Sequence, residues 1–123
     1  MLDSKIATTM DTIKSLHLPN RFEQKLLSSV DYIFSREIPQ LESIILFGSC
    51  ARNELRVTSD VDLLIITTEQ LDRASRGEIA SVLEEELDGV GTDAIFYTHE
   101  QYENSTRLFT TQVKKDGLVL YHI

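Results

Sequence analysis

Two continuous apolar runs limit the possible folds of this chain more than any other feature. Residues 44–47 and 63–66 are apolar at every position, and each run is too short for an ordinary helix. A strand with one face in water alternates apolar and polar residues, whereas a strand buried on both faces is continuously apolar. The two runs therefore predict inner strands, over residues 43–47 and 61–67, in a sheet that is covered on both sides.

Three other segments have the periodicity of amphipathic helices. Apolar residues recur every three or four positions in segments 4–16, 20–38 and 76–87, so each segment is expected to bury one face. Asn20, with Glu23 three residues later, predicts the N-cap of the second helix, and Pro39 predicts its end. Gly89 predicts the end of the third helix.

Shorter elements complete the pattern. Residues 50–56 predict one or two helical turns, and residues 92–97 predict a third strand. Thr98 and Gln101 form a capping-box pattern that predicts helical segments up to residue 116, and residues 118–121 predict a short final strand. Strands that alternate with helices indicate an α/β domain, with a mixed β-sheet of three to four strands flanked by helices.

The composition excludes several classes of protein. The 123 residues fit one compact domain, and 12 basic against 20 acidic residues give a formal net charge of −8. This charge argues against sequence-independent binding to nucleic acid, which needs basic residues, and against an anionic membrane surface. The sequence has no long apolar run and no signal-peptide pattern, and its single Cys50 fits a reducing compartment. We therefore expect a cytoplasmic protein that contacts neither membrane nor nucleic acid.

Two aspartates stand at the start of the second apolar strand. Because side chains alternate along a strand, Asp60 and Asp62 project from the same face, about 6.5 Å apart at Cα. Two carboxylates so close together on a Leu- and Ile-rich strand are costly unless a cation lies between them, and Mg²⁺ suits oxygen ligands. Taken alone, the pair also fits a solvated turn that leads into a strand.

Two further features are placed to join this site. Gly48-Ser49 follows the first strand, where a glycine lets the backbone approach an anion and the amides and serine hydroxyl that follow can donate to it. Asp93 lies near the start of the third predicted strand and reaches the same metals if that strand lies next to the second. Each feature alone also fits an ordinary turn or strand start.

The spacing of these features resembles a known signature. Ten residues separate Ser49 from Asp60, as in the Gly-Ser-x10-Asp-x-Asp motif of the DNA polymerase β-like nucleotidyltransferase superfamily. The closest resemblance is to its minimal nucleotidyltransferase (MNT) branch. Ala51-Arg52, Ser59 and the closing segment 114–121 match as well, so the likeness covers about two-thirds of the chain. It implies a single nucleotidyltransferase domain over residues 1–123, with N-terminal helices in 1–40 and a catalytic core in 41–123.

Two positions depart from the family pattern. Asn53 stands where a glycine is common, but asparagine tolerates left-handed backbone angles better than most residues, so the turn is expected to survive. Cys50 stands where small or polar residues are usual. We interpret it as a small buried group and not as a nucleophile, because no histidine is near it in the sequence.

The resemblance also implies a mechanism. In this family the aspartates hold two Mg²⁺ ions, which assist in-line attack of a hydroxyl on the α-phosphate of ATP, with release of pyrophosphate. The implied metal-binding and catalytic residues are Asp60, Asp62 and Asp93, and the implied nucleotide-binding residues are Gly48, Ser49 and Arg52. Asp93 is also placed to help take the proton of the acceptor. Arg52, on its own, fits an exposed helix arginine equally well.

The acceptor is expected to lie on another molecule, because larger relatives bind it with a second domain for which this chain has no room. MNT proteins are commonly antitoxins paired with a HEPN ribonuclease toxin, and they transfer AMP to a toxin tyrosine. By resemblance, this is our leading hypothesis, and a homo- or hetero-oligomer is compatible with it. Two alternatives stay open: an antitoxin that silences its partner by binding alone, and nucleotide transfer to RNA or to a small molecule.

Overall fold

The computed structural model describes residues 2–123 and contains a four-stranded sheet in the order β3-β2-β1-β4. The parallel pair is β2 and β3, whereas β1 runs antiparallel to both of its neighbours, β2 and β4. The predicted α/β class and mixed sheet are therefore confirmed. The strands are β1 (Leu41–Phe47), β2 (Val61–Thr67), β3 (Thr92–Thr98) and β4 (Leu118–His122).

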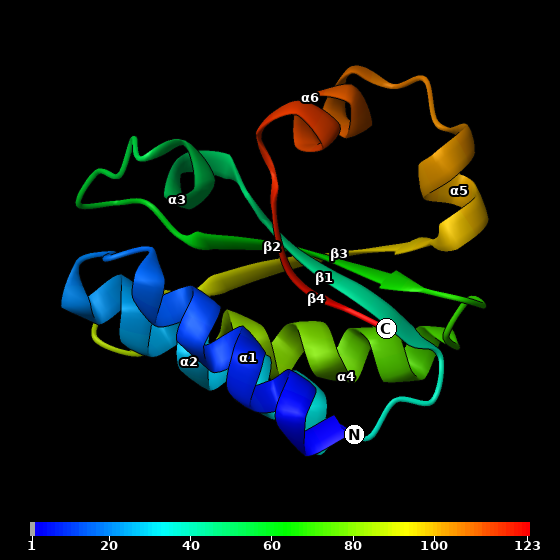
Figure 1. Cartoon of the computed structure of the whole chain (residues 1–123), viewed down its shortest axis with the longest axis horizontal. Helices are drawn as coiled ribbons and strands as arrows, with labels where there is room; N and C mark the ends of the chain where they lie inside the picture. The colour runs from blue at the N-terminus through cyan, green and yellow to red at the C-terminus, as the bar shows by residue number, and fades with distance from the viewer. Residues whose placement is uncertain (1) are drawn as a thin grey trace.

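Helices cover both faces of this sheet (Figure 1). One face packs against α1 (Leu2–Ser15), α2 (Asn20–Ser35) and α4 (Arg73–Glu84). The opposite face carries α5 (His99–Asn104) and α6 (Leu108–Asp116). The short helix α3 (Gly48–Arg52) lies on this side next to α6 (Figure 1), although its Cys50 joins the core on the other side. The molecule thus has three layers, and the sheet lies in the middle one. None of the helices in residues 2–123 is long and apolar enough to cross a membrane.

Burial on both faces explains why the central strands are continuously apolar. Leu63 and Ile65 of β2 point into the cluster under α1, α2 and α4, whereas Leu64 and Ile66 point into a smaller cluster under α5 and α6. All four side chains are at most 2% exposed. Burial of each such side chain stabilises the fold by about 1.5–3 kcal/mol. The register of β2 is therefore held by both layers.

The start of α2 differs from the prediction. Pro19 occupies the N-cap position, Asn20 is the first helical residue, and no side chain caps the helix. The backbone carbonyl of Pro19 accepts hydrogen bonds from Phe22 N at 2.9 Å and Glu23 N at 3.0 Å. The helix also ends at Ser35, earlier than the limit set by Pro39. The predicted asparagine cap was wrong by one position because proline favours the extended backbone that an N-cap needs.

The short helix after β1 also begins earlier than predicted. It spans Gly48 to Arg52 instead of residues 50–56, and Asn53 ends it in the left-handed conformation, with φ 56° and ψ 41°. The expectation that Asn53 preserves this turn is confirmed. The turn sends the chain back along α3, where Glu54 N donates to Ser49 O at 2.9 Å.

Helix α4 is shifted towards the N-terminus relative to the predicted segment 76–87. It begins at Arg73 after an Asp72 cap and ends at Glu84, and Val82 and Leu87 are 36% and 40% exposed. Leu87 instead pairs with Val90 across a turn. Periodicity misplaced the end of the helix because Leu87 continues the helical spacing although the chain has already turned.

Candidate active site

The register of β2 and β3 brings two of the predicted aspartates together. Asp62 is the direct neighbour of Asp93 in this parallel pair, so the two side chains leave the same face of the sheet on strands about 4.8 Å apart. This is the face covered by α5 and α6, because Ile95 and Tyr97, further along β3, belong to that cluster. Asp60 ends the loop before β2, and Val61 N donates to Gly91 O at 3.0 Å beside it.

Gly48 places the glycine-serine turn against the same carboxylates. Its φ is +73°, in the left-handed region that glycine adopts without strain. A Cβ at this position would overlap Oδ2 of Asp62 and would lie 3.1 Å from its Cγ. The Asp62 carboxylate therefore packs directly on the Gly48 backbone, and a residue with a side chain does not fit there.

The three carboxylates are close enough to repel one another. Burial raises the pKa of Asp62 to about 6, and the negative charges of Asp93 and Asp60 add to this rise. The Arg52 guanidinium opposes it with a smaller effect. The raised pKa of Asp62 therefore reflects first its burial and second the negative charges beside it, and a bound cation would stabilise the ionised form.

The donor chemistry of this cluster fits a magnesium site. Asp60, Asp62 and Asp93 offer only carboxylate oxygens, which are the ligands that Mg²⁺ prefers, and a cation would offset the repulsion that Asp93 and Asp60 exert on the Asp62 carboxylate. In the part of the chain that the structure describes, residues 2–123, no three acidic, histidine or cysteine side chains are arranged closely enough to hold a metal ion. The fit thus rests on donor type and charge.

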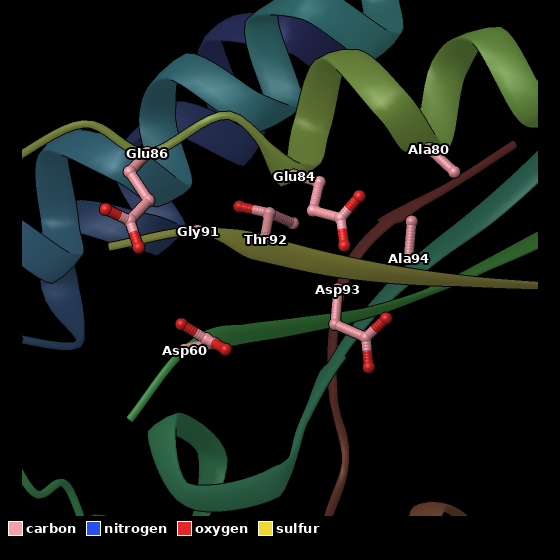
Figure 2. A pocket seen from close by; sticks show the side chains of 8 residues that line it. All are labelled: Asp60, Ala80, Glu84, Glu86, Gly91, Thr92, Asp93 and Ala94. Carbon is pink, nitrogen blue, oxygen red and sulfur yellow. The ribbon is translucent and has the colours of Figure 1, made fainter. Parts of the chain in front are cut away.

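A cavity of about 480 Å³ extends from two of these carboxylates around the edge strand β3. Figure 2 shows Asp60 and Asp93 on one side of the β3 ribbon, and Glu84, at the end of α4, on the other. Glu86 also lines this space. Neither glutamate stands out in the sequence, because both belong to an acidic run that looks like a solvated helix end.

Ser49 and Arg52 lie on a second groove, of about 470 Å³, next to α3. Arg52 Nε forms an ion pair with Glu54 Oε2 at 3.2 Å. Two further polar residues, Arg56 and Ser59, line the same groove. Arg56 and Glu54 were not among the predicted site residues, although both lie between the two parts of the signature.

Cys50 has the structural role that the sequence predicts. The residue is 4% exposed, and burial raises the pKa of its thiol to about 12, with further contributions from the charges of Asp62 and Asp60. The thiol therefore stays protonated and is a poor nucleophile.

A family model described as "Polymerase beta, Nucleotidyltransferase" matches residues 28–123 of the chain. The match includes the whole glycine-serine turn and all three aspartates, as well as the second half of α2. Among curated proteins, none matches this sequence.

Several solved structures are similar in fold and in sequence. A chain of a toxin-antitoxin complex with AMP-PNP is 25% identical, with a TM-score of 0.60 over 78% of this chain and 73% of that one. A mutant MntA-HpeT toxin-antitoxin complex contains a chain that is also 25% identical, with a TM-score of 0.57, covering 78% and 72% of the two chains. A complex of a tri-AMPylated HEPN toxin with its MNT antitoxin, from Shewanella oneidensis, matches at 25% identity and a TM-score of 0.54, covering 80% and 73%.

Proposed function

Because this chain belongs to the polymerase β nucleotidyltransferase family, we propose that it transfers AMP from ATP to a tyrosine hydroxyl group of a HEPN-type toxin, and that it acts as the antitoxin of that toxin. The observation that carries the proposal is the meeting of Asp62 with Asp93 on neighbouring strands, directly against Gly48. The similar complexes with AMP-PNP and with an AMPylated toxin support ATP as the substrate and a protein as the acceptor.

Each residue of the site has a role that follows from its position. Gly48 leaves the backbone open beside the Asp62 carboxylate, so a nucleotide can approach it closely. Ser49 and Arg52, on the groove beside α3, bind the outer phosphates and offset their charge. Asp93, which is exposed at the start of β3, accepts the proton of the attacking hydroxyl.

Asp60, Asp62 and Asp93 would hold two Mg²⁺ ions. When bound, these ions would supply the positive charge that stabilises both the attacking and the leaving oxygen of the displacement. The chain's own contribution is to keep Asp62 and Asp93 on one face of the sheet and to hold Asp62 half-buried, which strengthens its attraction for a cation.

The remaining proposals concern the setting of the protein. Residues 1–123 form one nucleotidyltransferase domain, in which 41–123 make the catalytic core and 1–40 make the helices that support it. The partner toxin completes the active complex by presenting the acceptor, as a hetero-oligomer in the cytoplasm. The acidic net charge of −8 suits a partner with a basic surface, because opposite charges accelerate association.

The test is the mass of the partner toxin after incubation with this protein, ATP and Mg²⁺. We expect an increase equal to one or more adenylyl groups, lost when the toxin tyrosine is changed to phenylalanine and strongly reduced by Asp93→Asn. Tight binding without a mass change would show instead that the protein neutralises its partner by covering it. Labelling of added RNA, but not of the toxin, would show a different acceptor.

A further inference from the structure

The groove beside α3 contains more positive charge than the proposed nucleotide contacts use. Its lining comprises Ser49, Arg52, Glu54, Leu55, Arg56 and Ser59. Two arginines on one groove are notable in a chain in which only 12 of 123 residues are basic. One of them, Arg52, is the arginine of the signature, and the other, Arg56, has no assigned function.

The loop that carries Arg56 has a defined position. Arg56 N donates to Ser59 Oγ at 2.8 Å, and Ser59 N donates back to Arg56 O at 3.0 Å. Arg21 of α2 reaches across and donates from Nη2 to Val57 O at 2.6 Å. Because both its own turn and α2 hold this loop, the Arg56 side chain starts from a fixed backbone beside the groove.

The two arginines differ in their partners. Arg52 is engaged by Glu54 at 3.2 Å, and both side chains are exposed, at 38% and 65%. Among the described residues 2–123, Arg56 has no carboxylate within ion-pairing distance. An anion that enters the groove would therefore meet one free guanidinium and one that a glutamate already occupies.

We infer that Arg56 is a second cationic contact for the β- and γ-phosphates of the nucleotide, and that Glu54 competes with those phosphates for Arg52. This inference rests on the proposed function, because it deepens the triphosphate site of the same reaction. Ser49 and Arg52 link the groove to the aspartates in two ways. Ser49 directly follows Gly48 in the chain, and the positive charge of Arg52 lowers the pKa of the Asp62 carboxyl. The outer phosphates thus extend away from the carboxylates along α3, and the leaving pyrophosphate stays in contact with Arg56 until it dissociates.

The two side chains predict opposite effects on affinity. Hydrogen bonds between charged groups contribute to binding affinity, and Arg56→Gln removes the charged donor. The affinity for a triphosphate should therefore fall about tenfold. An exposed ion pair contributes less, so Glu54→Gln should tighten triphosphate binding by up to about fivefold. Neither change should alter the affinity for AMP, which has no β- or γ-phosphate.

The experiment compares the affinities of AMP-PNP and AMP, both with Mg²⁺, by isothermal titration calorimetry. The variants are Arg56→Gln, Arg56→Lys, Glu54→Gln and a control, Arg73→Gln. Arg73 is an exposed arginine at the start of α4, beyond the far end of β2 from the groove. We expect Arg56→Lys to retain part of the affinity, because it keeps the charge but loses the planar fork, and Arg73→Gln to bind as the wild type does.

Three results would overturn the inference. If the Arg56→Gln and Glu54→Gln variants bind AMP-PNP with the affinity of the wild type, neither residue has the role inferred for it. The proposed function would stay intact. Equal losses for AMP and AMP-PNP would show that the substitutions disturb the fold or the whole site instead of the outer phosphates. If the wild type itself binds neither ligand, the proposed function fails, and the inference fails with it.

Discussion

Asp62→Asn removes a half-buried charge that lies beside two other carboxylates, and we expect it to stabilise the metal-free protein. The pKa of Asp62 is raised from 3.8 to about 6 by burial, then by Asp93 and Asp60. A rise of about two units corresponds to about 3 kcal/mol of unfavourable ionisation. Because the side chain is not fully buried, solvent screens part of this energy, and about 1–2 kcal/mol remains as the expected gain in the free energy of unfolding.

The pH dependence gives this prediction a distinctive form. The carboxyl has a higher pKa in the folded state than in the unfolded state, so the folded protein binds more protons between about pH 4 and pH 6. Stability from this group therefore falls as the pH rises through that window, and the full penalty is present at pH 7. The amide of the variant does not titrate, so its advantage over the wild type should be small at pH 4 and reach its maximum above pH 6.

Urea denaturation in EDTA at several pH values measures both quantities. Asp11→Asn, at an exposed position of α1, is the matched control and should change the free energy of unfolding by less than about 0.5 kcal/mol. A less stable Asp62→Asn variant at pH 7, or a difference from the wild type that does not vary with pH, would refute the electrostatic description of the site. The stabilised variant should also lose transferase activity.

Three further predictions concern other parts of the structure. Gly48→Ala should destabilise the protein by more than the 1–2 kcal/mol cost of a left-handed φ of +73°, because its Cβ also displaces Asp62; urea denaturation measures this. Ser29 Oγ and Thr92 Oγ1 form a buried hydrogen bond of 2.7 Å. Ser29→Ala should lower the free energy of unfolding by about 1–3 kcal/mol. In a double-mutant cycle, the Ser29→Ala, Thr92→Val double variant should lose less stability than the sum of the two single variants. Asp72→Ala should lower the melting temperature at neutral pH, because it removes the cap of α4. Hydrogen bonds from Ser75 lower the pKa of Asp72 in the folded state. The difference in melting temperature should therefore disappear as the pH falls through this lowered pKa.

The faces on which Asp62 and Asp93 lie were predictable because alternation along a strand is local and can be read from the sequence. Alternation along β2 and β3 gives Asp62 and Asp93 defined faces, and the apolar neighbours of each show which strands are buried. The adjacency of the two strands is not local, since it depends on the packing of α4 across the sheet. The sequence predicted that Asp93 reaches Asp60 and Asp62 only if β3 lies next to β2. The register of these two strands shows that they are neighbours.

Features that depend on competing local signals were predicted less well. Leu87 continues the helical spacing of α4, but it lies beyond the end of the helix, where Lys25 donates from Nζ to Glu85 O at 2.6 Å. Asn20 is a good cap in isolation, but Pro19 precedes it. Arg56 and Glu54 gave no signal because a charged loop residue looks the same in a sequence whether or not it faces a groove. Tertiary contacts decide the end of α4 and the surroundings of Arg56 and Glu54, whereas the neighbouring proline decides the cap of α2.

The central claim is that carboxylates from two neighbouring strands, beside Gly48, form one cation-dependent nucleotide site. The most direct measurement is the melting temperature with and without Mg²⁺ and AMP-PNP, for the wild type and for an Asp60→Ala, Asp62→Ala double variant. A ligand at about 100 times its Kd stabilises the folded state by about 2.7 kcal/mol, so the wild type should melt at a clearly higher temperature and the double variant should not respond. Equal increases in both proteins would place the nucleotide elsewhere and would contradict the claim.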